Sequence, residues 1–228
     1  MYFPHPFTAD KSGLLAIGGD LSPDFIILAY RFGIFPWYSA GDPLMWWFPP
    51  ERFVLKTGQV HVPKSMRRYL NNPIFSVTVD RHFDFIIDQC QNTPRPGQKG
   101  TWITPEMKVA YKNLHNLGLA HSIEIWYNKE IVGGLYGLGI GKIFSGESMF
   151  SHTTDASKFG VIILDKVLRL QGYQMIDCQQ YTYHMELLGG YPMDQNTYFT
   201  EVRKNLFQPL SRQRWSMDLI PELYRHDP

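Results

Sequence analysis

Apolar and polar residues alternate through the second half of the chain in a pattern that predicts a β-sheet. The residues from His121 to Trp126 alternate, and apolar runs follow at Ile131 to Gly139 and at Ile143 to Phe150. Asn128-Lys129 separates the first two runs and has the composition of a hairpin turn. A helical pattern from about Asp155 to Leu170 leads to a fourth apolar run. Three antiparallel strands, a helix and another strand predict a mixed α/β sheet.

Strand and helix patterns also alternate before this sheet. The residues from Phe75 to Val79 read as a strand, and Asp80 is expected to cap a helix that runs to about Gln91. A second helix is predicted from Pro105, with one apolar face, and Gly118 is its expected stop. These elements place two helices next to the predicted sheet.

The first 55 residues carry a helix followed by a loop rich in proline and tryptophan. Ser22 and Pro23 are start signals of that helix, and Gly33 follows its last apolar position. We therefore expect a small N-terminal domain over residues 1–55 and a larger α/β domain over residues 56–228. No flexible linker marks the boundary between them.

Length and composition are those of a globular protein. The chain has 228 residues, of which 44% are hydrophobic and 15% aromatic, enough for one large domain or two unequal ones. Its two cysteines, Cys90 and Cys178, form no disulfide framework and no metal-ligand spacing. The N-terminus lacks the pattern of a signal peptide, and no apolar run reaches membrane-spanning length. We expect a soluble, cytoplasmic protein that binds no metal.

Basic residues gather in one segment although the net charge is only +1. Between Arg52 and Val79 there are five basic residues and no acidic one. In a helix from about Pro63, the side chains of Lys64, Arg67 and Arg68 would share one face. This face is a candidate for binding phosphates, and the alternative is an ordinary solvated helix surface.

Polar residues occupy positions where a buried sheet normally carries apolar ones. Glu147 lies in the run GESMF, and Asp177 and Gln179 lie in the run IDCQ. Because alternate residues of a strand share a face, we expect Asp177 and Gln179 to point one way and Cys178 the other. Pairing of the two strands would bring Glu147 within reach of the same space. We expect the chemistry of the protein there.

Two nucleotide-binding motifs are only partly matched. The segment GGLYGLGIGK resembles a phosphate-binding P-loop but lacks two of its residues. Tyr136 stands where the motif needs glycine, and Ile143 stands where it needs Ser or Thr. The pyrophosphate turn of an acyl-CoA enzyme is approached only by Arg169 and Gly172, which lie at the end of a predicted helix instead of its start. We therefore expect no cofactor.

A thiol hydrolase and a metal enzyme also fit poorly. Cys178, His184 and Asp177 are the residue types of a catalytic triad, but Cys178 is expected to face away from Asp177. The histidines 115, 121 and 184 form no metal-ligand spacing.

Aromatic residues and prolines cluster between Phe35 and Pro50. The default interpretation of such a cluster is the core of a small unit. Rings in loops stiffened by proline also form platforms on which unpaired bases stack, at about 1–3 kcal/mol per base.

Several longer blocks point to one family. The blocks GGDLSP, AYRFGIFPW, WWFPPERFVL, GTWIT, AHSIE, GESMFS, DASK and IDCQ occur in this order between Phe3 and Leu188. Together they closely resemble the leucyl/phenylalanyl-tRNA–protein transferases of bacteria. The chain departs from the family pattern in an extended TPRPGQKG before GTWIT and in the tail after Arg203. The resemblance implies an acetyltransferase-type (GNAT-like) α/β domain, or α+β domain, behind the small N-terminal domain.

The resemblance also implies an activity and its partners. The implied reaction moves Leu, Phe or Met from aminoacyl-tRNA to the α-amine of a protein that begins with Arg or Lys, which marks the product for N-degron proteolysis. It places Trp37 and Trp102 near the adenosine end of the tRNA, with Tyr30 in the same aminoacyl and adenosine site. Phe144, Met149 and Ile176 are implied as walls of an apolar aminoacyl pocket. We expect the chain to act as a monomer.

The implied reaction is aminolysis of an ester that is already activated, so neither ATP nor a metal is required. A free α-amine has a pKa of about 7.7–8.0 and must lose a proton to attack. We hypothesise that Asp177 orders the amine and takes its proton, and that Gln179 orients the amine or the ester carbonyl. Glu147 would steer the basic side chain of the acceptor or support Asp177. Two other classes stay open, an acyl-CoA-dependent small-molecule N-acyltransferase and a non-catalytic aminoacyl-tRNA-binding module.

Overall fold

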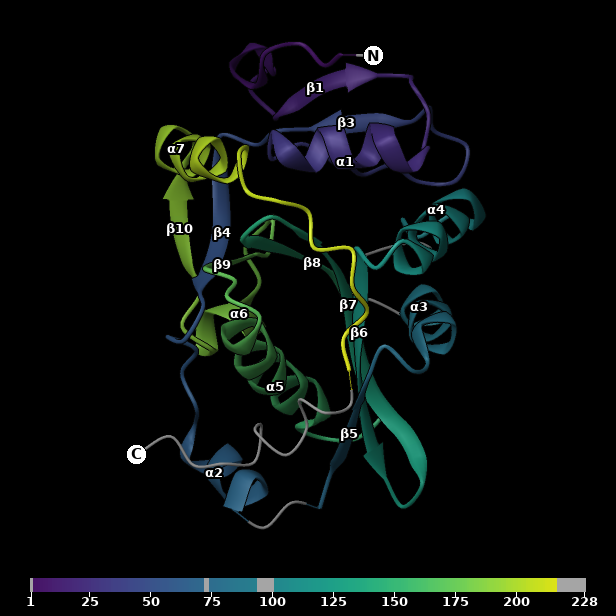
Figure 1. Cartoon of the computed structure of the whole chain (residues 1–228), viewed down its shortest axis with the longest axis vertical. Helices are drawn as coiled ribbons and strands as arrows, with labels where there is room; N and C mark the ends of the chain where they lie inside the picture. The colour runs from purple at the N-terminus through teal and green to yellow at the C-terminus, as the bar shows by residue number, and fades with distance from the viewer. Residues whose placement is uncertain (1, 72–73, 94–100, 217–228) are drawn as a thin grey trace.

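A seven-stranded mixed sheet with the order β10-β4-β9-β8-β7-β6-β5 dominates the fold (Figure 1). In that order its strands are Tyr191–Asp194, Glu51–Lys56, Met175–Asp177, Ile143–Ser151, Glu130–Ile140, Ala120–Tyr127 and Ser76–Val79. The pairing of β8 with β9 is parallel, and the other neighbours pair antiparallel. This computed structural model describes residues 2–71, 74–93 and 101–216, so most of the TPRPGQKG segment lies outside the described residues.

Helices cover both faces of the sheet. α3 (Phe83–Asn92) and α4 (Pro105–Asn116) lie on one face, and α5 (Ala156–Leu170) lies on the other (Figure 1). Two adjacent glycines of β7 allow this close approach. A Cβ on Gly133 would lie 2.8 Å from Ala156 of α5, and one on Gly134 would lie 2.4 Å from Ile86 of α3. The predicted mixed α/β class is confirmed, as is the order of three antiparallel strands, a helix and another strand, which pairs in parallel with β8.

Asp80 does not cap α3, which begins at Phe83 after His82. Its backbone is left-handed, with φ at 52°, and its carboxylate accepts hydrogen bonds from the backbone N–H groups of Ser122 and Trp215. Trp215 also stacks on His121 with ring centroids 4.1 Å apart. Asp80 therefore anchors the segment that follows α7 (Gln195–Asn205), the last helix that the structure describes. The sequence patterns did not predict the position of this segment.

The N-terminal residues form a smaller sheet with the order β1-β3-β2, beside α1 (Pro23–Arg31). The strands are Leu14–Ile17, Met45–Trp47 and Phe35–Pro36, and a 3-10 helix precedes them at Pro6–Thr8. The predicted helix is confirmed. Pro23 occupies its first turn, and Gly33 ends it with a φ of 72° that suits glycine.

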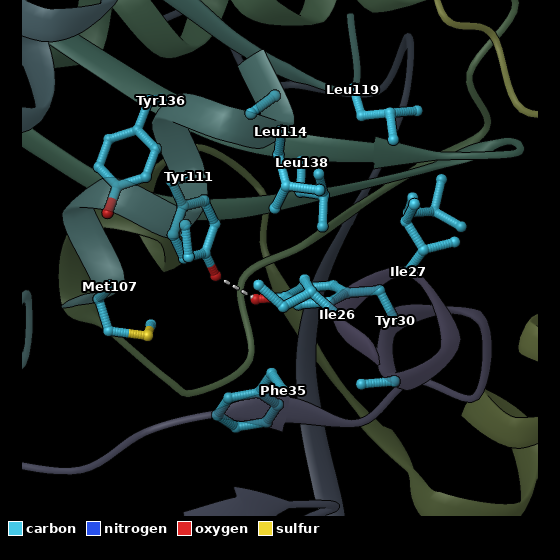
Figure 2. Packing of buried hydrophobic residues seen from close by; sticks show 14 of the residues in the cluster. Ile26, Ile27, Tyr30, Phe35, Met107, Tyr111, Leu114, Leu119, Tyr136 and Leu138 are labelled. Atoms are coloured by element: carbon cyan, nitrogen blue, oxygen red, sulfur yellow. Dashed lines mark hydrogen bonds between the residues drawn. The ribbon is translucent and has the colours of Figure 1, made fainter. Parts of the chain in front are cut away.

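The two sheets share one hydrophobic core. Ile26 and Tyr30 of α1, and Phe35, pack in one cluster with Met107 and Tyr111 of α4 (Figure 2). β4 crosses residue 55 and belongs to the large sheet. We therefore propose that the boundary between the two units lies before Glu51.

Of the remaining helices, one contacts α5 and one lies at the edge of the sheet that β10 forms. They are α2 (Lys64–Asn71), α6 (Tyr183–Leu187) and α7 (Gln195–Asn205). α7 packs against β10 and β4 (Figure 1). Among the described residues, no helix combines the length and the apolar character needed to span a membrane.

Candidate active site

A cavity opens where β8 and β9 part. The two strands pair only from Ile143 to Ser145 and from Met175 to Asp177. β8 then continues to Ser151, while β9 ends at Asp177. A cavity of about 320 Å³ lies beyond the last pair, a size typical of small-ligand pockets. The residues predicted for the site that line it are Trp37, Trp102, Glu147, Met149, Ile176 and Gln179.

Apolar side chains and two half-buried tryptophans line the cavity. Val161 and Leu164 of α5 line it together with Met149 and Ile176. Trp37 and Trp102 come from distant parts of the sequence and both line the cavity. The indole of Trp47 donates a hydrogen bond of 2.6 Å to the carbonyl of Trp37, which fixes that loop. An apolar side chain and a flat ring system could therefore occupy adjacent parts of one space.

Glu147 faces this cavity and is held by two tyrosines. Tyr30 donates to Oε1 at 2.8 Å and Tyr111 donates to Oε2 at 3.0 Å. The two hydroxyls also lie 2.6 Å from each other (Figure 2). Burial raises the pKa of Glu147 to about 7, against the lowering effect of both tyrosines. Tyr30, expected to contact the ligand, thus lies behind Glu147, and Tyr111 was missed because it reads as an ordinary core residue of α4.

Asp177 does not line the cavity, which corrects the expected geometry. Its side chain is only 1% exposed and forms a two-point ion pair with Arg52, at 2.7 and 3.2 Å. The hydroxyl of Tyr198 donates to it at 2.8 Å. Strand alternation failed as a guide because β9 ends at Asp177 itself. Arg52 and Tyr198 were not predicted, since nothing in the sequence pairs residues so far apart.

Gln179 lies after the end of β9 in a left-handed conformation with φ at 57°. Its backbone N–H donates to Oδ1 of Asp177 at 3.0 Å. In one orientation its side-chain amide donates to Glu147 at 3.3 Å. In the other it donates to the carbonyls of Gly146 and Cys178 at 2.9 Å each, and its oxygen is then turned toward Glu147. We favour the second orientation because it forms two shorter bonds.

Cys178 lines the cavity, contrary to the expectation that it faces away. Burial raises the pKa of its thiol well above the ordinary range, with a smaller contribution from Asp177. A thiol that stays protonated is a poor nucleophile. Nε2 of His184 is buried without a hydrogen-bond partner, so it is not aligned with a thiol. The structure therefore gives no support to a thiol hydrolase, although for a different reason than the strand face.

Phe144 is placed away from the cavity, which corrects its expected role as a wall. It is fully buried and packs against Tyr173 and Trp215, with ring centroids 6.2 and 5.7 Å away. Ile176, which pairs with Phe144, does line the cavity. The covering ring of Trp215 belongs to the C-terminal segment, whose position the sequence did not reveal.

The three basic residues predicted to share a helix face lie on α2. Lys64, Arg67 and Arg68 are exposed, whereas Met66 and Tyr69 are buried on the other side of the helix. The guanidinium of Arg68 lies 4.5 Å from the centre of the Tyr69 ring. Together they form a positively charged surface.

Comparison with known families agrees with this geometry. Residues 54–203 match the family model described as leucyl/phenylalanyl-tRNA protein transferase, and residues 19–50 match the model of its N-terminal domain. The chain belongs to this family. Its members are aminoacyltransferases that use aminoacyl-tRNA and protein substrates.

Relatives in this family match along nearly the whole chain. The leucyl/phenylalanyl-tRNA–protein transferase of Syntrophus aciditrophicus (strain SB) is 48% identical over 94% of this chain and 90% of the relative. That of Myxococcus xanthus (strain DK1622) is 44% identical over 94% of this chain and 92% of the relative. Among solved structures, a GCN5-related N-acetyltransferase from Kribbella flavida matches weakly, with a TM-score of 0.41 and 9% identity over 73% of this chain and 59% of that chain.

α5, the helix after β8, begins after Asp155, whose side chain makes no capping hydrogen bond and pairs with Lys158 at 3.1 Å. Arg169, which was compared with a pyrophosphate motif, lies in the last turn of this helix and not at the start where a helix binds anions. Among the described residues, no three His, Cys, Asp or Glu side chains converge on a metal position.

Proposed function

We propose that this transferase moves Leu, Phe or Met from aminoacyl-tRNA to the α-amine of proteins that begin with Arg or Lys. The product would carry an N-degron that directs it to proteolysis. The main support is the meeting of Glu147 and Gln179 on the wall of an apolar cavity. A group that can accept a proton thus lies next to a space for an uncharged side chain. Both suit the reaction of an aminoacyltransferase, the class to which this family belongs. The cytoplasm is the proposed location because aminoacyl-tRNA is made there.

The geometry changes the roles proposed for the polar residues. Asp177 is occupied by Arg52 and Tyr198, so we propose that it positions Gln179 and does not take the proton itself. Glu147 faces the cavity and has a pKa of about 7, close to that of an α-amine. We propose that the attacking amine lies between the oxygen of Gln179 and Glu147, and that Glu147 accepts its proton as the amine attacks the ester carbonyl. The same proton then passes to the ribose oxygen of the tRNA as the ester bond breaks.

The apolar part of the cavity would hold the aminoacyl side chain. Met149, Ile176, Val161 and Leu164 offer apolar contacts and no charge. A flexible methionine in the wall would let one pocket accept Leu, Phe and Met. The rings of Trp37 and Trp102 are proposed to contact the terminal adenosine. Alignment of amine and ester in such a site contributes up to roughly 7–11 kcal/mol to catalysis.

The exposed face of α2 is proposed to contact phosphates of the acceptor arm. Lys64, Arg67 and Arg68 supply charge without base-specific hydrogen bonding. We expect this contact to raise the affinity for every accepted tRNA alike. The chain is proposed to act as a monomer, because one chain supplies all groups of the site named above.

The proposed function is tested by incubating the protein with labelled Leu-tRNA and a peptide that begins with Arg. Label is expected in the peptide, and a peptide of the same sequence with an acetylated N-terminus should receive none. Label that stays on the tRNA despite tight binding would indicate a non-catalytic binding module. Acyl transfer from acyl-CoA to a small amine, without transfer from tRNA, would indicate an N-acyltransferase.

A further inference from the structure

Arg52 is a fully buried charged residue behind the wall of the active-site cavity. It is 1% exposed, and its guanidinium lies between two rings, 4.7 Å from the centre of Phe35 and 4.4 Å from that of Tyr198. Phe35 comes from the N-terminal sheet and lines the cavity, while Tyr198 comes from α7. The side chain of Arg52, on β4, thus contacts both the N-terminal sheet and helix α7 next to the site.

The guanidinium and Tyr198 together fix the carboxylate of Asp177. Arg52 donates to both carboxylate oxygens, and Tyr198 donates to Oδ2 while accepting from Arg52 at 3.1 Å. Planar two-point pairs of this kind restrict rotation of a carboxylate more than a single bond does. Oδ1 is consequently held at the position where it accepts the backbone N–H of Gln179.

The conformation of Gln179 needs such support. A residue other than glycine in the left-handed region is strained by roughly 1–2 kcal/mol, and it persists only where the surroundings hold it. The bond from its N–H to Asp177 is the side-chain contact that holds this turn. Without it this turn keeps the backbone bonds of Cys178 and Gln179 to Phe53 but loses its side-chain support, which allows the amide of Gln179 to move away from Gly146 and Glu147.

We propose that Arg52 and Tyr198 are positioning residues for aminoacyl transfer. They hold the carboxylate of Asp177, which holds the backbone of Gln179 and so aims its amide at the attacking amine. This inference rests on the proposed function of the site and adds two residues that do not themselves touch the substrate.

A role in stability alone is a poorer explanation of this network. Nη1 of Arg52 is buried and has no hydrogen-bond partner. Buried ion pairs often contribute little to stability compared with apolar side chains of the same volume. Arg52 directs two donors to Asp177 and leaves Nη1 without a partner. This orientation fits a residue that fixes the carboxylate better than one whose own hydrogen bonds are all formed.

The test is a double-mutant cycle between Tyr198→Phe and Gln179→Ala, with kcat and KM measured for Leu-tRNA and an Arg-initiated peptide. Tyr198→Phe keeps the ring against Arg52 and removes only the hydroxyl. Loss of a hydrogen bond to a charged group predicts a fall in kcat of about tenfold with KM for the tRNA unchanged. In the Gln179→Ala background the same substitution should have little further effect.

Tyr173→Phe is the matched control. Tyr173 is a buried tyrosine that packs on Phe144 and Trp215 and is not among the residues that line the cavity. Its loss of a hydroxyl should leave kcat unchanged. Arg52→Lys keeps the charge but loses the planar fork, so it should act in the same direction as Tyr198→Phe.

A second measurement does not depend on activity. The side-chain amide signal of Gln179 in ¹⁵N-labelled protein, assigned by its absence in Gln179→Ala, should shift in Tyr198→Phe and not in Tyr173→Phe. Multiplicative losses in the double mutant, or an unmoved Gln179 signal, would overturn the positioning role. A wild-type protein that transfers nothing would instead refute the proposed function, while the amide signal would still decide the positioning.

Discussion

Asp177 and Glu147 lie on two strands that part at the active site, and only the carboxylate of Glu147 faces the cavity. Asp177 is paired with Arg52, whereas Glu147 accepts hydrogen bonds from the hydroxyls of Tyr30 and Tyr111. The charge of Asp177 also contributes to the raised pKa of Glu147, after burial as the larger cause. Two carboxylates with different partners thus fit two different roles.

Glu147→Gln is expected to lower kcat by about 10²–10⁴-fold, the usual range for loss of a general base. In the wild type, kcat should fall as the pH drops through about 7, because Glu147 becomes protonated there. The groups around Glu147 that set this value are Tyr30, Tyr111, Asp177 and Arg52. The pH–rate profile of the variant should lack the limb at about 7 and keep only that of the α-amine at about 7.7–8.0. An unchanged limb at about 7 would assign the proton transfer to another group.

Stability should depend on pH in the opposite sense. Burial raises the pKa of Glu147 from its ordinary value of 4.5 to about 7, so between these values the folded chain keeps a proton that the unfolded chain loses. This group therefore stabilises the fold most below pH 4.5 and loses that contribution as the pH rises to 7. Urea unfolding of wild type and Glu147→Gln across this window should show a smaller decline in the variant.

Asp177→Asn is expected to lower both transfer and stability. The variant leaves the buried guanidinium of Arg52 without its counter-ion, and breaking a buried pair costs about 3–5 kcal/mol. Urea unfolding measures this cost, and kinetics on the folded fraction measure transfer. Normal stability with lost transfer would indicate that Asp177 takes the proton directly.

The aminoacyl cavity is expected to discriminate against branching at Cβ. A wall of packed side chains penalises a branch at Cβ, near the ester, more than it penalises a longer side chain. A difference of one methyl group changes the free energy of the transition state by about 1–3 kcal/mol. The ratio of kcat/KM for Leu-tRNA over Ile-tRNA should therefore be roughly 10- to 200-fold. Equal values would show that the wall does not select by shape.

Arg67→Ala with Arg68→Ala is expected to weaken binding of all accepted tRNAs by similar factors. The slope of log affinity against log salt should fall by about one for each phosphate that no longer has a basic partner. Lys11→Ala with Lys129→Ala removes two exposed charges elsewhere and is the matched control. If both double variants change the slope equally, the effect is one of net charge and α2 makes no specific contact with the tRNA.

Cys178→Ala is expected to retain transfer within a few-fold of wild type. The thiol lines the cavity but its raised pKa keeps it protonated, so its loss changes only the shape of the pocket. Assays with Leu-tRNA and Phe-tRNA would show whether the wider pocket alters their ratio. A folded but inactive variant would return a nucleophilic cysteine to consideration.

The sequence predicted local structure well and side-chain direction poorly. The strands and helices from Phe75 to Leu170 follow from periodicity, since each carries several residues of its own pattern. The direction of Asp177 failed because β9 is short and its alternation is broken by the left-handed backbone of Gln179. Arg52, Tyr111 and Tyr198 were missed because each reads locally as an ordinary strand or helix residue. Their roles arise from contacts between segments far apart in the chain.

Because β8 and β9 stop pairing after Ser145 and Asp177, β8 has backbone groups inside the sheet that β9 leaves unpaired. In its favoured orientation, the Gln179 amide donates to the carbonyl of Gly146 at a place where β9 no longer supplies a partner. A side-chain amide thus substitutes for a backbone amide, and the ladder on either side stays intact. The oxygen of Gln179 that is proposed to hold the attacking amine is therefore aimed before the substrate binds, and no strand has to move. The enzyme alone should accordingly have the same rigid backbone as the enzyme at work.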